Sequence, residues 1–211
     1  NRPVSLSITR ILASRPWAAP DRVTWIVLAV SLVGAALAAH GSYSATLGGA
    51  ILMHLGSVLD GVDGELARLR FEQSARGAWF DTITDDFTNV VFWLALGAGA
   101  HATGKAPWLV AAGLVAAASN ALAAVLGYVR LWRKGTGDFY ALEADDRRPT
   151  SAAAARVVHV VGALLKQDFF LFAAMVLAAL DLLHEVLPLV ALGGLLTLGN
   201  AALRFTSRKD T

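Results

Sequence analysis

The chain has 211 residues, of which 56% are hydrophobic and 16% are charged. Soluble globular proteins carry nearer ~25% charged residues, so this composition is typical of a protein embedded in a membrane. The length accommodates six helices of ~20 residues with short connections, which leaves no room for a second large soluble domain. The absence of cysteine excludes disulfides and thiolate metal sites. A net charge of +2 does not indicate a nucleic-acid partner.

Residues 1–20 lack the continuous apolar core and the cleavage site of a signal peptide. Val4, Ile8 and Leu12 recur at helical spacing with arginines around them, which is typical of an amphipathic helix in the membrane interface. A frayed terminus is the competing interpretation. Because the chain begins with Asn1 rather than Met, we expect that it was cut from a longer protein.

The rest of the chain contains six apolar windows that predict membrane-spanning helices. They cover residues 23–39, 45–59, 78–100, 108–131, 169–183 and 186–203. We therefore predict an all-α polytopic membrane bundle of six transmembrane helices, preceded by an N-terminal interfacial amphipathic helix at 1–20. The membrane domain is expected to cover 21–206, with a cytoplasmic tail at 207–211.

Basic residues are distributed unevenly between the predicted loops. The connections at 40–44, 101–105 and 184–185 contain a single basic residue, Lys105, whereas arginines gather at the other helix ends. By the positive-inside rule, both termini and the Arg-rich loops are cytoplasmic. The longest polar stretch, 133–151, joins two spans on that side, and the apolar residues that follow it fit a segment lying along the interface.

Five aspartates lie within residues 60–86, at the cytoplasmic ends of two predicted spans. Asp60 and Asp63 share one helix face, and so do Asp81 and Asp85, so two adjacent helices can aim four carboxylates at one point. Clustered carboxylates repel one another unless they are protonated or neutralised by a cation, and oxygen ligands suit Mg²⁺ or Mn²⁺, as one ion or a pair.

Other interpretations compete with this metal site. Asp60 or Asp86 alone fits a helix cap or a solvated interface residue. A proton or cation pathway also uses intramembrane acids, but here they gather at one edge instead of crossing the membrane. Gly64 and Gly77 reduce bulk beside the carboxylates, or serve ordinary helix packing. Arg68 is placed to meet phosphate oxygens, although arginines at this depth commonly snorkel to the interface.

The run from residue 60 to 85, DGVDGELARLRFEQSARGAWFDTITD, resembles the signature of the CDP-alcohol phosphotransferase family, D-x2-D-G-x2-A-R-x8-G-x3-D-x3-D. All eight fixed positions are filled at the family's spacing. The segment APDRVTW, residues 19–25, is similar to the family's T-P-N-x-V-T segment, with Asp21 where Asn is usual. Asp86 is a further departure, because many relatives have a basic residue there.

The resemblance implies a metal-dependent enzyme that transfers a substituted phosphate from a CDP-linked donor to the hydroxyl of an alcohol and releases CMP, in phospholipid or related polyol-phosphate biosynthesis. By position, the implied metal ligands are Asp60, Asp63, Asp81 and Asp85, and Asp85 is also the implied general base. The implied CDP-binding residues are Asp60, Asp63, Gly64, Ala67, Arg68, Gly77, Asp81 and Thr24.

The opening segment resembles members of that family that use inositol phosphate, some of which carry an upstream soluble cytidylyltransferase domain. We therefore expect a polyol-phosphate acceptor such as inositol 1-phosphate, with CDP-diacylglycerol or CDP-inositol as the donor. Glycerol 3-phosphate, serine and free inositol stay open as acceptors. Candidate ligands for the acceptor phosphate are Arg130, Arg133, Lys134, Lys166 and Arg204, although the positive-inside rule alone also explains these charges.

Two other function classes are compatible with the composition. A divalent-cation transporter predicts acids near the membrane midplane with access from both faces, and a non-catalytic membrane anchor predicts a broken signature. Small-residue runs such as residues 113–127 permit tight packing within one bundle or between two chains. The resemblance implies a homodimer.

Overall fold

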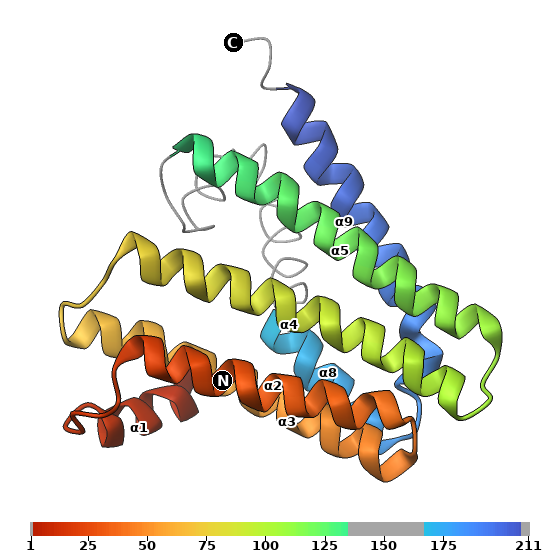
Figure 1. The fold of residues 1–211 in the computed structure, drawn as a ribbon, viewed down its shortest axis with the longest axis horizontal. Coiled ribbons are helices and arrows are strands. Elements are labelled where there is room, and N and C mark those ends of the chain that lie inside the picture. The colour runs from red at the N-terminus through yellow and green to blue at the C-terminus, as the bar shows by residue number, and fades with distance from the viewer. Residues whose placement is uncertain (1, 135–166, 208–211) are drawn as a thin grey trace, which may run out of the picture.

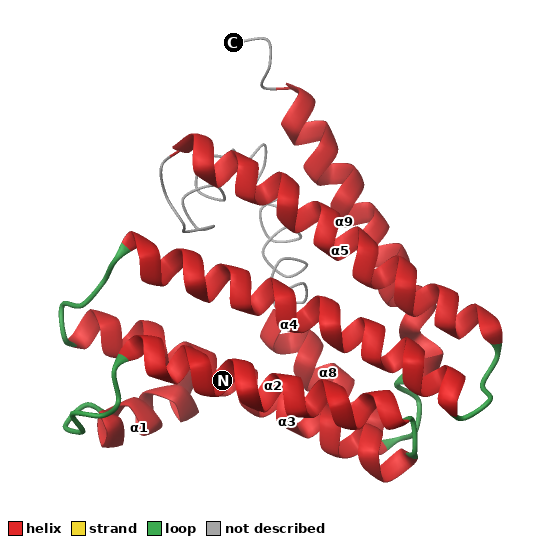
Figure 2. Cartoon of the chain, viewed as in Figure 1, coloured by secondary structure: helices red, strands yellow, loops and turns green. Residues whose placement is uncertain are grey.

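The structure is a computed structural model that describes residues 2–134 and 167–207. Within these residues it is all-helical (Figures 1 and 2). The helices are α1 (Arg2–Leu12), α2 (Pro20–His40), α3 (Tyr43–Leu69), α4 (Ala75–Ala102), α5 (Pro107–Lys134), α8 (Gln167–Ala179), the 3₁₀ helix η1 (His184–Val186) and α9 (Leu187–Ser207).

A helix stands at each of the six predicted windows. Four described helices are long and apolar enough to cross a membrane, namely α2, α3, α5 and the stretch His184–Leu203, which covers η1 and most of α9. The described part of α8 is apolar but shorter, and the first half of α4 contains one arginine and three aspartates. The integral-membrane class is therefore supported, and the count of six spans stays a prediction.

Two helix ends differ from the sequence-based boundaries. The second apolar window ends at residue 59, whereas α3 continues to Leu69 and so carries the first half of the signature as helix, in agreement with the shared helix face of Asp60 and Asp63. Hydropathy alone cuts this helix short because its last turns are polar. At the other end of the bundle, α8 stops at Ala179, and Asp181 then adopts a left-handed φ of 56°.

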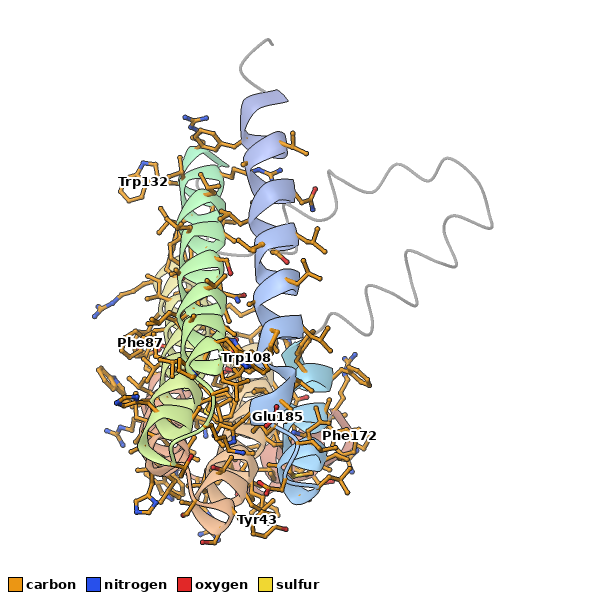
Figure 3. All side chains as sticks on the ribbon, turned by 90° about the vertical axis from the view of Figure 1, so that its right-hand side faces the viewer. Tyr43, Phe87, Trp108, Trp132, Phe172 and Glu185 are labelled. Atoms are coloured by element: carbon orange, nitrogen blue, oxygen red, sulfur yellow. The ribbon has the colours of Figure 1, made fainter. Side chains whose placement is uncertain are left out.

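Small residues let the helices approach closely, as is common in membrane bundles. A Cβ on Gly49 of α3 would lie only 2.5 Å from the carbonyl oxygen of Gly34 on α2. Large apolar side chains such as Phe92 and Leu96 fill the interior between α3, α4, α5 and α8. Others, including Trp132 on α5, project outward (Figure 3). Such outward apolar surface suits contact with lipid.

The loops between the helices collect at two ends of the bundle (Figure 2). The end with the turns after α2, α4 and α8 holds an ion pair between Lys105 and Glu185, whose Nζ and Oε1 atoms are 3.8 Å apart. The opposite end has the turns after α1 and α3 and the start of α4. This alternation matches the predicted loop grouping, whereas the assignment of the Arg-rich end to the cytoplasm stays a prediction.

The N-terminal segment forms helix α1, which packs against α3 beside the start of α2 (Figure 1). Apolar residues of these three helices and their connection form a small second core that includes Ala18, Val23, Val62 and Leu66. The position of α1 in a membrane interface stays a prediction. The predicted interfacial segment after residue 151, Lys166 and the end of the tail lie outside the described residues.

Candidate active site

Three carboxylates converge where the end of α3 meets the start of α4. One oxygen from each of Asp60, Asp63 and Asp81 lies within 4.8 Å of the others, so the three could hold a metal ion. The loop of residues 70–74 reverses the chain between the two helices and brings the carboxylates together. Asp63 is only 5% exposed. Such close, poorly solvated carboxylates repel one another unless they are protonated or neutralised by a cation.

The chemistry of this cluster fits a divalent cation. The Oδ1 atom of Asp81 is buried and has no hydrogen-bond partner in the structure. A buried polar oxygen without a partner is costly, and coordination to a metal removes that cost. Carboxylate oxygens are the ligands that Mg²⁺ and Mn²⁺ prefer.

Asp85 lies one helical turn beyond Asp81 on α4, as predicted from the spacing. Its carboxyl group lies close to that of Asp60, which places it next to the carboxylate cluster. It is not one of the three residues whose ligand oxygens gather within 4.8 Å. The fourth acid of the signature is therefore beside the cluster, with a different environment from the other three.

Neighbouring donors fix the orientation of Asp63. The hydroxyl of Thr24, on α2, donates to Oδ2 of Asp63 at 2.6 Å, and the backbone N–H of Gly64 donates to Oδ1. Both carboxylate oxygens are thus held in place by groups from two helices. Hydrogen bonds of this kind orient metal ligands and set their basicity.

A pocket of about 280 Å³ opens beside the cluster, between the start of α2, the end of α3 and the start of α4. Residues predicted for CDP binding that line it are Thr24, Asp63, Gly64, Ala67, Arg68, Gly77 and Asp81. Asp60 is absent from the lining and joins the site through the carboxylate cluster. The helical end of α3 therefore presents one face of the signature to this pocket.

Two glycines and one arginine shape the pocket wall. The guanidinium of Arg68 lies over Gly64, such that a Cβ on Gly64 would be 3.6 Å from Nη2. Gly77 lies in the first turn of α4. Its backbone N–H donates to the side-chain hydroxyl oxygen of Ser74, the N-cap residue of α4, at 3.0 Å. These positions leave backbone and a cationic side chain facing the cavity, an arrangement suited to phosphate groups.

Other lining residues were not predicted from the sequence: Pro20, Glu72, Gln73, Ser74 and Ala78. A Ser followed by a polar helix start is a recognisable N-cap signal, so Ser74 could have been found in this way. Asp21 also lines the pocket, and its Oδ1 would be 3.9 Å from a Cβ on Gly77. The departure from the family's usual Asn thus lies within the pocket itself.

The capping interpretation of the acids is wrong, because Asp60 and Asp86 lie inside α3 and α4 and Ser74 occupies the N-cap of α4. Asp86 faces α5, where the hydroxyl of Tyr128 donates to its Oδ2 at 2.8 Å. The ring of Tyr128 in turn contacts Trp79 at a centroid distance of 5.9 Å.

Of the candidate acceptor residues, Arg130 and Arg133 have described side chains, and neither lines this pocket. The Arg133 guanidinium lies over the ring of Phe205 on α9, with its Cζ atom 5.0 Å from the ring centroid, and Arg130 lies one turn earlier on α5. Lys134 is the last residue of α5, and Arg204 lies in the last turn of α9, which ends at Ser207. Lys166 lies outside the described residues.

Comparison with known proteins gives a consistent result. The family model for CDP-alcohol phosphatidyltransferase matches residues 17–187. Three curated relatives are each named bifunctional IPC transferase and DIPP synthase. Those from Rubrobacter xylanophilus, Aquifex aeolicus and Archaeoglobus fulgidus are 44%, 34% and 35% identical over 96, 96 and 92 residues, which are 44%, 46% and 44% of this chain.

The chain spans only 21%, 21% and 18% of the length of these relatives. The family model, in contrast, covers most of the chain and every residue that lines the pocket. With the signature, the carboxylate cluster and the pocket in one place, the chain belongs to the CDP-alcohol phosphatidyltransferase family.

Proposed function

We propose that the protein is an integral-membrane transferase that moves a substituted phosphate from a CDP-linked donor to an alcohol hydroxyl and releases CMP. The observation that carries this proposal is that Asp63 and Asp81 belong both to the carboxylate cluster and to the lining of the pocket. A diphosphate bound in this pocket would lie against the cluster.

Asp60, Asp63 and Asp81 would hold the divalent cation, with Asp85 beside Asp60 as a further ligand for a second ion. When bound, Mg²⁺ or Mn²⁺ neutralises the diphosphate charge and stabilises the leaving CMP. Thr24 keeps Asp63 in orientation through their hydrogen bond.

The pocket residues would bind the CDP part of the donor. Arg68 offers its guanidinium to the phosphate oxygens, and Gly64 and Gly77 let the backbone approach the nucleotide. The pocket opens at the helix ends, so the nucleotide can stay in water while the substituent on its β-phosphate reaches into the membrane.

In the reaction, the acceptor hydroxyl oxygen forms a bond to the β-phosphorus, and the bond from that phosphorus to the bridging oxygen breaks. The bridging oxygen leaves with CMP. We assign Asp85 as the general base that takes the hydroxyl proton, because it lies outside the tight group of three carboxylates and one turn along α4.

The acceptor we propose is a polyol phosphate such as inositol 1-phosphate. The names of the relatives support a member of the family with this type of chemistry. Arg130, Arg133, Lys134, Lys166 and Arg204 are the proposed ligands of its phosphate. CDP-diacylglycerol and CDP-inositol are the two candidate donors, and we place the site and both termini on the cytoplasmic face of a homodimer.

The test is CMP release by the purified protein in detergent with Mg²⁺. CDP-diacylglycerol and CDP-inositol are each paired with inositol 1-phosphate, glycerol 3-phosphate, serine and inositol, with Asp85→Asn as the control. Release that needs one donor and one acceptor and is lost in the variant supports the proposal. A folded protein that binds Mn²⁺ but releases no CMP from any pair contradicts it and favours cation transport.

A further inference from the structure

A buried carboxylate outside the candidate active site connects helix α1 to the end of α3. Glu65 accepts a hydrogen bond at Oε1 from the hydroxyl of Ser5, at 2.9 Å, and at Oε2 from the hydroxyl of Thr9, at 2.7 Å. The three residues are 9%, 3% and 1% exposed, respectively. We refer to this arrangement of Ser5, Thr9 and Glu65 as the Glu65 clamp.

The clamp acts on the same helical turn that carries active-site groups. Glu65 follows Gly64 directly and lies two residues after Asp63, and both of these residues line the pocket. One face of the turn therefore contacts α1 while another faces the pocket. A shift of this turn relative to α1 would move Asp63 and Gly64 together.

A second contact fixes the other end of α1 to the same region. One nitrogen of Arg70, Nη2, donates to the backbone carbonyls of Leu12, Ala13 and Arg15 at 3.2, 3.1 and 2.9 Å. These carbonyls lie at the end of α1 and just after it, where a cation is favourable. The connection then leads within a few residues to Pro20 and Thr24, which line the pocket from α2.

Helix α1 thus helps to fix the position of α2 relative to α3, the two helices that contribute Thr24 and Asp63 to the pocket. Thr24 from α2 and Asp63 from α3 meet in a 2.6 Å hydrogen bond, and α1 contacts α3 at Glu65 and continues into α2. The clamp itself contains no pocket residue. Its hydroxyls satisfy a carboxylate that would otherwise be buried at a high cost.

We propose that the Glu65 clamp is a positioning device for the donor and metal site, so that Ser5, Thr9 and Glu65 control donor binding without touching the donor. This inference rests on the proposed function for its kinetic readout. It predicts a selective effect: the clamp sets the KM for the CDP-linked donor and the affinity for metal, and it leaves kcat and the KM for the acceptor unchanged.

The test compares Thr9→Val, which keeps the side-chain shape and removes the hydroxyl, with Thr9→Ser, which keeps the hydroxyl. Ser7→Ala is the matched control on the same helix, because Ser7 is exposed and its hydroxyl donates to the Pro3 carbonyl at 2.9 Å within α1 itself. Ser5→Ala is a second, milder variant that leaves the Thr9 bond in place. Each protein is measured for donor KM, acceptor KM, kcat, Mn²⁺ affinity by electron paramagnetic resonance, and helical content by circular dichroism.

We expect Thr9→Val to raise the donor KM and the Mn²⁺ dissociation constant by about tenfold, since it removes one hydrogen bond to a buried carboxylate. Thr9→Ser and Ser7→Ala should behave as the unaltered protein, with helical content equal in all. Where Thr9→Val does not fold, Ser5→Ala should show the same selective change at a smaller size. Unchanged donor KM and Mn²⁺ affinity in a folded clamp variant would overturn the proposal, as would an equal loss of kcat and acceptor binding.

The two proposals can fail separately. If the unaltered protein releases no CMP with any substrate pair, the proposed function is wrong, and the Mn²⁺ titration alone then decides the clamp. Weaker Mn²⁺ binding in Thr9→Val than in Thr9→Ser still supports positioning by the clamp, and equal binding overturns it.

Discussion

Thr24 and Asp63 form a 2.6 Å hydrogen bond between α2 and α3, with the hydroxyl as donor and Oδ2 as acceptor. Both residues are buried, and both line the pocket. The contact joins two segments separated by 39 positions and fixes one of the three carboxylates that could hold a metal. The segment around Thr24 is therefore tied to the carboxylate cluster by direct contact.

Removing the Thr24 hydroxyl should weaken metal binding. In Thr24→Val the Oδ2 atom of Asp63 loses its donor, and loss of such a contact lowers metal affinity or activity by about ten- to a hundredfold. Titration of Mn²⁺ by electron paramagnetic resonance measures the effect. Thr24→Ser keeps the donor and should bind Mn²⁺ normally, whereas equal affinity in the Val and Ser variants would show that the hydroxyl does not matter.

Asp85→Asn should separate chemistry from binding. If Asp85 takes the proton of the acceptor hydroxyl, kcat should fall by about 10²- to 10⁴-fold, a larger loss than that of CDP binding with Mn²⁺. Discontinuous assays of CMP release measure kcat, and calorimetry in the presence of Mn²⁺ measures the affinity for CDP. Asp86→Asn is the neighbouring control, since Asp86 faces Tyr128 on α5. A loss of Mn²⁺ binding in Asp85→Asn as large as in Asp63→Asn would instead make Asp85 chiefly a metal ligand.

Removing divalent cations should abolish CMP release and lower thermal stability. Without a cation, Asp60, Asp63 and Asp81 keep their mutual repulsion in a partly buried place. A ligand that binds only the folded state at 100 times its Kd contributes about 2.7 kcal/mol to stability. Thermal unfolding after EDTA treatment, then with Mg²⁺ or Mn²⁺ restored, measures this gain. In Asp81→Asn, the melting temperature should rise less when the cation is restored. A melting temperature that stays the same with and without Mg²⁺ or Mn²⁺ would contradict the metal site.

Much of the architecture follows from the sequence because apolar windows and polar breaks are local signals. Hydropathy alone does not give the end of α3, because the apolar run stops near residue 59 while the helix continues to Leu69. The polar residues there are satisfied by partners distant in sequence, such as Ser5 and Thr9 for Glu65 and Thr24 for Asp63. No hydropathy pattern contains such tertiary partners.

The candidate site likewise combines features that local spacing predicts with features that depend on tertiary contacts. The spacing of Asp60, Asp63 and Asp81 was enough to expect carboxylates from two helices at one point, since the helix repeat determines which residues share a face. It did not reveal that Asp86 is turned toward Tyr128 on α5, because that contact depends on how α4 packs against α5. The acceptor side is less defined for the same reason, since Arg130 and Arg133 lie on α5, outside the pocket.

Two adjacent glycines on α3 should respond differently to substitution by alanine. A Cβ at position 49 would lie 2.5 Å from the Gly34 carbonyl oxygen and 2.9 Å from the Ala38 nitrogen, so Gly49→Ala must separate α2 from α3. A Cβ at Gly48 would make only an ordinary contact, 3.5 Å from Cδ1 of Leu37. We expect Gly49→Ala to cost about 1–3 kcal/mol, as overpacked interiors do.

Thermal unfolding of the two variants in the same detergent compares their stability directly. Gly48→Ala should unfold near the temperature of the unaltered protein, and Gly49→Ala clearly below it. Equal melting temperatures would mean that α2 and α3 are not packed as closely as the structure shows.

Phe71, in the loop between α3 and α4, should be a site where glycine stabilises the protein. Its φ of 57° lies in the left-handed region, which costs a non-glycine residue roughly 1–2 kcal/mol, and its side chain is 94% exposed and so contributes little packing. Phe71→Gly should therefore raise the melting temperature. Phe71→Ala keeps a Cβ and with it the strain, so it should show no such gain. A fall in melting temperature in both variants would contradict this prediction and would mean that the exposed ring makes a stabilising contact. If the partner in that contact is lipid, the fall should be larger in nanodiscs than in detergent.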